Sequence, residues 1–240
     1  MKKLTLGNEA VARGAYEAGV RVATAYPGTP STEITESIAK YDEIYSEWSP
    51  NEKVALEVAI GASVGGARAI CSMKHVGLNV AADPLFTVSY TGVNGGLVIM
   101  VADDPGMHSS QNEQDSRFYA RSSKVPMLEP ANSQECKDFV MEAFNISEKY
   151  DCPVIVRLST RIAHSQSIVE IGERKNVELK PYVKNPAKYV MMPAMARGRH
   201  IEVEKRMAAL KEFSNETPLN RIEWGSKKIG IITSGISYQF

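Results

Sequence analysis

Residues 51–69, NEKVALEVAIGASVGGARA, place one carboxylate at the start of a long run of small and apolar residues. Small side chains at Ala55, Ala59, Ala62 and Gly66 form a flat stripe at helical spacing, which favours close packing against a sheet or another helix. We therefore expect a helix that begins near Glu52. Burying a charge is costly unless it is paired or hydrogen-bonded, so Glu52 is either exposed at the first turn or positioned to meet a ligand.

The first alternative is ordinary helix chemistry. Acidic residues in the first turn are stabilised by the helix dipole and the free backbone N–H groups. Ser49, Pro50 and Asn51 supply suitable turn and capping residues just before Glu52. From position alone, this structural role is the simpler interpretation of Glu52.

The surrounding sequence predicts an α/β fold. Helical and strand-like segments alternate through the first 160 residues, which is typical of a mostly parallel, twisted sheet with helices on both faces. Strands are expected at residues 19–25, within 41–48, and at 69–73, 95–102 and 153–158. Further helices are expected at 8–18, 31–39, 79–88 and 133–148.

Three regions follow from the changes in composition. Residues 1–169 are predicted to form the first domain, and residues 170–226 a surface linker with one helix at 202–213. Residues 228–235, KIGIITSG, resemble a first strand that ends in a glycine turn. We therefore expect residues 227–240 to open a following domain that is cut at its start.

The composition argues against several classes of protein. Lys plus Arg and Asp plus Glu both number 28, and no basic stripe is present, so nucleic-acid binding is not expected. No apolar run is long enough for a signal peptide or a membrane span, which favours a cytoplasmic protein without membrane contact. Cys71, Cys136 and Cys152 form no Cys-x-x-Cys pair, so we expect core cysteines and no metal or iron–sulfur site.

Ligands of open α/β sheets bind beyond the carboxyl ends of the strands. Three loops occupy such positions, Tyr26–Thr32, Lys74–Asn79 and Asp103–Asp115, and Glu52 opens the helix between the first two. No Walker loop, G-x-G-x-x-G turn or nucleophile elbow is present. The phosphates of any cofactor are therefore expected to be held elsewhere.

Each loop has a functional and a structural interpretation. The two prolines of residues 26–30, YPGTP, make a rigid bend in which Thr29 offers a hydroxyl to a substrate, although a plain strand-to-helix turn has the same composition. Lys74 and His75 bring a cation and an imidazole to a strand end, where solvated loop residues are the alternative. Residues 103–115 are polar enough for a lid or partner loop, but equally typical of turns.

Taken together, these motifs resemble a known family. The segments are YPGTPSTE at 26–33, Asn51-Glu52 with GAS at 61–63 and GARA at 66–69, and Gln114-Asp115 with YAR at 119–121. This combination is similar to the alpha subunits of indolepyruvate:ferredoxin oxidoreductases, which are thiamine-diphosphate-dependent 2-oxoacid:ferredoxin oxidoreductases. The resemblance covers residues 1–169 as a pyrimidine-binding domain and extends more loosely to the C-terminus.

The resemblance implies roles for individual residues. In thiamine enzymes a glutamate at this helix start, with a glycine nine residues later as at Gly61, hydrogen-bonds the ring nitrogen of the cofactor's aminopyrimidine. Glu52 would thereby act as catalytic acid–base through the cofactor. The cofactor-binding residues would be Glu52 and the bend residues Tyr26, Pro27, Gly28 and Thr29.

The resemblance also implies a reaction. The enzyme would oxidatively decarboxylate an aryl 2-oxoacid such as indole-3-pyruvate, pass electrons through [4Fe-4S] clusters to ferredoxin, and form an acyl-CoA with coenzyme A. Relatives place an arginine after the 95–102 strand against the substrate carboxylate, and here that position is Asp103. Thr29, Lys74, His75 and Asp103 are therefore the candidate substrate residues, with Lys74 or His75 replacing the arginine.

Two alternatives remain open at this point. One is a relative that acts on 2-oxoglutarate or branched-chain oxoacids, and the other is a non-catalytic assembly domain of the same fold. The expected partners are the remaining domains of the alpha subunit, a beta subunit and a second copy of the chain. The diphosphate-binding domain with its Mg²⁺ motif and the cluster cysteines are not in these residues, so the chain alone is expected to be inactive.

We predict that the isolated chain binds thiamine diphosphate only weakly, because it would hold at most the pyrimidine half of the site. Isothermal titration calorimetry of the isolated chain with the cofactor and Mg²⁺ measures this directly. Tight binding would contradict the prediction.

Overall fold

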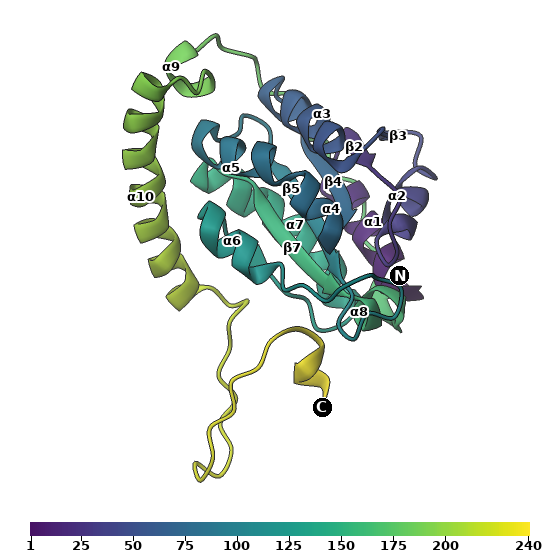
Figure 1. Ribbon diagram of the computed structural model, residues 1–240. Coiled ribbons are helices and arrows are strands. Elements are labelled where there is room, and N and C mark those ends of the chain that lie inside the picture. The colour runs from purple at the N-terminus through teal and green to yellow at the C-terminus, as the bar shows by residue number, and fades with distance from the viewer.

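The computed structural model describes residues 1–240 as a six-stranded parallel sheet between two helical layers (Figure 1). The strand order is β3-β2-β4-β5-β7-β6, and every neighbouring pair is parallel. The predicted fold class is therefore confirmed. The strands are β2 (Val22–Ala25), β3 (Tyr45–Trp48), β4 (Ala69–Lys74), β5 (Leu97–Asp103), β6 (Met127–Leu128) and β7 (Val154–Ser159).

Strand β5, near the middle of the sheet, contributes side chains to an apolar core on each face. Every residue of β5 is buried. Val98, Met100 and Ala102 belong to one apolar cluster, and the residues between them belong to the other. Successive side chains of a strand point to opposite faces, so a continuous apolar run suits a strand that is covered on both sides.

Helices cover both faces of the sheet. One apolar cluster takes side chains from α1 (Gly7–Glu17), α2 (Thr32–Ile38), α7 (Ser133–Tyr150) and α8 (Thr160–His164). The other takes them from α3 (Glu52–Val64), α4 (His75–Val80), α5 (Ala82–Thr91) and α6 (Arg117–Ser123). The helix expected at 79–88 is thus two helices, α4 and α5, whose boundary residue Ala81 serves as the C-cap of one and the N-cap of the other.

The sheet brings the predicted loops to one edge. Ala25 at the end of β2 pairs with Trp48 and Ser72, and Asp103 at the end of β5 pairs with Ser159. Because the strands are parallel, all their carboxyl ends lie on the same side. The three candidate loops and the start of α3 therefore leave the sheet at a common edge, as expected from the sequence.

Several elements of the fold were not anticipated from the sequence. β1 (Lys2–Leu6) pairs antiparallel with β8 (Gln166–Glu170) and joins the start of the chain to the end of the first region. The predicted linker also contains α9 (Pro186–Tyr189), and its long helix α10 spans Pro193–Glu216, well beyond 202–213. Figure 1 shows α10 running alongside α5.

Tertiary contacts explain the length of α10. Arg206 donates to the carbonyls of Asp151 and Ser89, and Arg199 pairs with the Asp151 carboxylate at 3.2 Å. These contacts join residues far apart in the sequence, so a local pattern does not reveal them. No helix of the structure combines the length and apolar character that crossing a bilayer requires.

The strand predicted at 228–235 is wrong for this chain. Residues 227–234 have no regular secondary structure, and Ile229, Ile231 and Ile232 are exposed. A strand requires a neighbour to satisfy its backbone N–H and C=O groups, and none pairs with this segment. The predicted division into domains remains a prediction.

We predict that Gly14→Ala destabilises the protein. A Cβ on Gly14 would lie 2.5 Å from the backbone oxygen of Lys137, so α1 and α7 would have to separate. The cost should be about 1–3 kcal/mol in the free energy of unfolding. Gly198→Ala is the control, because Gly198 lies in α10 with open space around it and alanine favours helix. Urea unfolding that ranks both variants equally would contradict the prediction.

Candidate functional site

Glu52 is a buried carboxylate without a partner. It is the first residue of α3, and the Asn51 side chain caps that helix by accepting the N–H of Val54 at 3.0 Å. Glu52 is only 8% exposed, and it forms no hydrogen bond or ion pair within the chain. Glu52 thus lies in the first turn of α3, as the simpler interpretation has it, but it is not exposed there. An uncompensated buried charge is costly, which points to a ligand that completes the site.

The Glu52 side chain is closely packed against α4. Gly77 of α4 lies against its side chain, since a Cβ at Gly77 would be 2.6 Å from Glu52 Oε1. Burial raises the pKa of the nearby Cys71 thiol to about 12, a hydrogen bond with Thr24 opposes this, and the charge of Glu52 adds to it. Cys71 therefore stays a neutral thiol. All three cysteines are free and buried, as predicted.

The Tyr26–Pro30 bend is held by hydrogen bonds on both sides. The Gly28 N–H donates to Thr32 Oγ1 at 2.9 Å, and the Ser31 hydroxyl donates to the Gly28 carbonyl at 2.7 Å. Asn8 Nδ2 donates to the Pro30 carbonyl at 2.8 Å. Tyr26, Pro27 and Thr29 are exposed, and the Thr29 hydroxyl has no partner in the chain. The bend is thus a rigid segment with groups free for a ligand.

The junction of β4 and α4 connects this bend to Glu52. A Cβ on Gly28 would lie 3.1 Å from Lys74 Cβ, while Gly77, three residues further on, lies against Glu52. The structure therefore brings the bend, the Lys74–Gly77 segment and the catalytic candidate together, as the sequence predicted. Gly77 itself was missed, although a glycine inside a helical stretch is a signal of close packing.

Lys74 and His75 are buried and hold the third loop. Lys74 Nζ donates to the Ser109 carbonyl at 2.6 Å, and His75 Nε2 lies 3.2 Å from the Asn112 carbonyl. A carbonyl only accepts, so this contact assigns the proton to Nε2. His75 Nδ1 then remains a buried acceptor without a donor. Neither residue is a solvated loop residue, and their contact with substrate remains a prediction.

Asp103 has an internal role. It has no exposed surface, and it accepts the N–H and hydroxyl of Ser116 and the Nε–H of Arg157 at 2.6 Å. Arg157 is also paired with Glu129 at 2.5 Å. A fully buried carboxylate that is already paired cannot reach a bound oxoacid. The predicted substrate contact of Asp103 is therefore not supported.

Asp104 anchors the 104–115 loop. Its carboxylate accepts the Ser109 N–H at 2.8 Å and the hydroxyls of Ser110 at 2.6 Å and Thr160 at 2.7 Å. Burial alone raises the pKa of Asp104. The three donors and the charge of Lys74 outweigh burial and hold this pKa well below its ordinary value. The loop is thus pinned at its first residue and again at Ser109 and Asn112.

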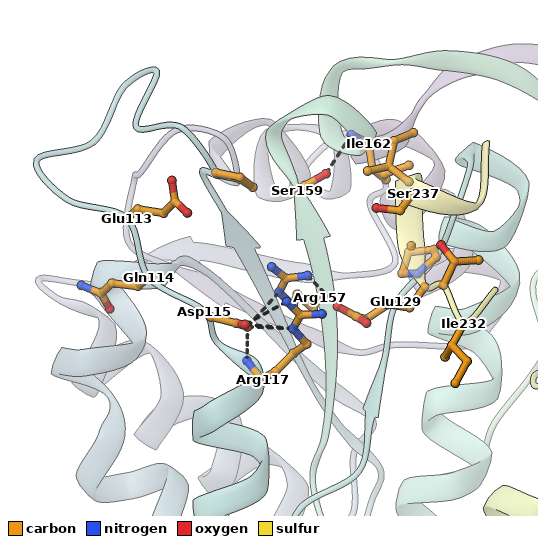
Figure 2. A pocket seen from close by; sticks show the side chains of 16 residues that line it. Glu113, Gln114, Asp115, Arg117, Glu129, Arg157, Ser159, Ile162, Ile232 and Ser237 are labelled. Carbon is orange, nitrogen blue, oxygen red and sulfur yellow. Dashed lines mark hydrogen bonds and ion pairs between the residues drawn. The ribbon is translucent and has the colours of Figure 1, made fainter. Parts of the chain in front are cut away.

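A cavity of about 570 Å³ opens beside this loop (Figure 2). Figure 2 shows Arg157 and Arg117 directed toward the carboxylates of Glu129 and Asp115. Arg117 pairs with Asp115 at 2.8 Å. Sequence reasoning missed Arg157, which lies on the strand next to Asp103. Because both guanidinium groups already have carboxylate partners, neither is a free anchor for a substrate carboxylate.

Comparison with known proteins identifies related chains. Residues 13–220 match the family model of the pyruvate flavodoxin/ferredoxin oxidoreductase, thiamine diphosphate-binding domain. Indolepyruvate oxidoreductase subunit IorA of Archaeoglobus fulgidus is 45% identical over 100% of this chain and 40% of its own length. The subunit IorA of Methanothermobacter marburgensis is 49% identical over 98% of this chain and 39% of its own.

A solved structure shares the fold. The 2-oxoglutarate:ferredoxin oxidoreductase from Magnetococcus marinus superposes with a TM-score of 0.73 at 19% identity, covering 88% of this chain and 45% of that chain. The chain spans about two fifths of the length of the IorA relatives. These matches agree with the resemblance inferred from the sequence motifs.

We predict that Asp104→Asn flattens the dependence of stability on pH. The pKa of Asp104 is lowered by folding, so the charged form stabilises the protein above the unfolded pKa of about 3.9. That contribution is lost as pH falls through the lower folded pKa. The variant should be less stable at pH 7 and should lose less stability between pH 4 and 2.5.

Urea unfolding across this pH range measures the effect. Asp42→Asn is the matched control, because Asp42 is exposed and forms no ion pair. Parallel pH profiles for the wild type and Asp104→Asn would contradict the prediction.

Proposed function

Since the chain belongs to the family of pyruvate flavodoxin/ferredoxin oxidoreductase thiamine-diphosphate-binding domains, we propose that Glu52 is the carboxylate of a thiamine diphosphate site. The observation that carries the proposal is the burial of this carboxylate without any partner in the chain. When Glu52 shares a proton with a basic ring nitrogen of the cofactor, the carboxyl group gains the hydrogen-bond partner that the chain does not supply. Glu52 and the bend then form the aminopyrimidine side of the site.

The residues present fit this cofactor. Glu52 offers an unpaired carboxylate on a largely buried side chain. The exposed groups of Tyr26 and Thr29 lie on a rigid bend joined to it through Lys74–Gly77. None of the three loops is a glycine-rich phosphate cradle, so the diphosphate and its Mg²⁺ are assigned to residues outside this chain. This division matches a chain that covers two fifths of its relatives.

Each residue has a defined task in the proposed site. Glu52 holds a proton and shares it with the ring nitrogen of the aminopyrimidine, which is general acid–base catalysis at a fixed carboxyl group. Tyr26, Pro27 and Gly28 shape the wall of the site, and Thr29 offers its hydroxyl to the oxoacid. When bound, thiamine diphosphate supplies the nucleophilic carbon that attacks the keto group of a 2-oxoacid.

We assign aryl 2-oxoacids, with indole-3-pyruvate as the example, as the substrates of the complete enzyme. The support is the name indolepyruvate oxidoreductase on relatives that are 45% and 49% identical over nearly the whole chain. The 2-oxoglutarate enzyme, at 19% identity, supports the fold alone. The unpaired Glu52 carboxylate also disfavours a purely structural assembly domain, which would have no use for an uncompensated buried charge.

The proposed reaction determines the partners. Oxidative decarboxylation releases carbon dioxide and two electrons, which [4Fe-4S] clusters outside this chain would pass to ferredoxin, while coenzyme A takes the acyl group. The remaining part of the alpha subunit, a beta subunit and a second copy of the chain complete the assembly in this proposal.

We predict that Glu52→Gln slows proton exchange at the thiazolium carbon of the cofactor in the complete enzyme. Glutamine keeps the size of the side chain but cannot share a proton with the ring nitrogen, so the rate should fall by about 10²–10⁴-fold. Exchange is followed by NMR after acid quench in deuterated buffer.

Glu57→Gln is the matched control, because Glu57 lies on the same helix and is exposed. Its exchange rate should equal that of the wild type. An unchanged rate in Glu52→Gln would remove Glu52 from the mechanism.

A further inference from the structure

Gly77 lies against the side chain of Glu52. An ideal Cβ on Gly77 would be 2.6 Å from Glu52 Cγ, 2.6 Å from Oε1 and 2.8 Å from Cδ. These three atoms are its nearest neighbours, and no backbone atom is among them. Any side chain at position 77 would therefore occupy the space of the Glu52 carboxylate.

Backbone conformation does not explain this glycine. Gly77 lies within α4, and its φ is outside the left-handed region that favours glycine. Alanine is the better residue inside a helix, because glycine loses more conformational freedom on folding. The absence of a side chain therefore has a steric reason, which is the space taken by Glu52.

Other tightly packed glycines differ in what they contact. A Cβ at Gly7 would meet the backbone oxygen of Ile162 at 2.0 Å, and one at Gly95 would meet that of Ala67 at 2.2 Å. Substitution there would force whole elements apart. At Gly77 the three nearest atoms all belong to the Glu52 side chain, so the displacement falls first on the Glu52 carboxylate.

We propose that Gly77 is a positioning residue for Glu52, keeping open the space in which the carboxylate faces its ligand. The inference rests on the proposed function of Glu52 and extends it to a second residue. Gly77 contacts neither cofactor nor substrate in this proposal. Its role is only steric, because the missing side chain leaves room for the Glu52 carboxylate.

The test is Gly77→Ala in the complete enzyme, with proton exchange at the thiazolium carbon as the readout. Displacing a catalytic group by about 1 Å costs on the order of 10²-fold, so exchange should slow at least roughly tenfold. The melting temperature should change by less than about 3 °C, which corresponds to the small cost of moving one side chain. Gly198→Ala on α10 is the matched control, because it is also a helical glycine and nothing lies within 4 Å of its added Cβ.

A double variant separates positioning from a general structural effect. If Gly77 acts through Glu52, Gly77→Ala should cause no further loss of exchange in a Glu52→Gln background. A further tenfold loss there, unchanged exchange in the single variant, or a melting temperature lowered by more than about 10 °C would each overturn the proposal.

A crystal structure of the Gly77→Ala chain tests the steric claim independently of the chemistry. The Glu52 carboxylate should be displaced from its position in the wild type, whereas Gly198→Ala should leave it in place. An unmoved carboxylate would overturn the proposal. Unchanged proton exchange in Glu52→Gln would instead refute the proposed function. The crystallographic test of the steric claim does not depend on that result.

Discussion

The parallel register of β2, β4 and β5 is the constraint on which the candidate site depends. Because these strands run in one direction, the Tyr26–Pro30 bend, the Lys74–Gly77 segment and the 104–115 loop all leave the sheet at the same edge. The apolar side chains of β5 alternate between two cores, so a slip of one residue would exchange their faces. Core packing thus positions polar loops that contribute little to it.

The buried carboxylates of the chain differ in whether they have a partner. Asp103 is paired with Arg157, and Asp104 accepts three hydrogen bonds. Glu17, also buried, pairs with Lys137 at 3.2 Å. Glu52 alone among these buried acids lacks a partner. Pairing lowers the cost of burial, so the unpaired carboxylate is the one for which we propose a bound ligand.

Small residues serve two purposes around this carboxylate. The alanines of α3 allow it to pack against the sheet, with Ala55 and Ala59 in the apolar core. Gly28 and Gly77 instead allow the β4–α4 junction to approach the bend on one side and Glu52 on the other. The same junction sends Lys74 and His75 to the 104–115 loop. One short segment therefore contacts the bend, the start of α3 and the 104–115 loop.

Local pattern alone determined the α/β class, the start of the helix at Glu52 and the three loops at one edge. Apolar periodicity is a local property, and the alternation of strands and helices predicts parallel strands. Family resemblance added the proposed role of Glu52. Only the tertiary structure decided that Asp103 is buried against Arg157, that Gly77 faces Glu52, and that α10 is held by Asp151. Each of these depends on contacts between residues distant in the chain. Residues 228–235 also depend on distant residues, because a segment with a strand pattern forms a strand only where a neighbouring strand pairs with it.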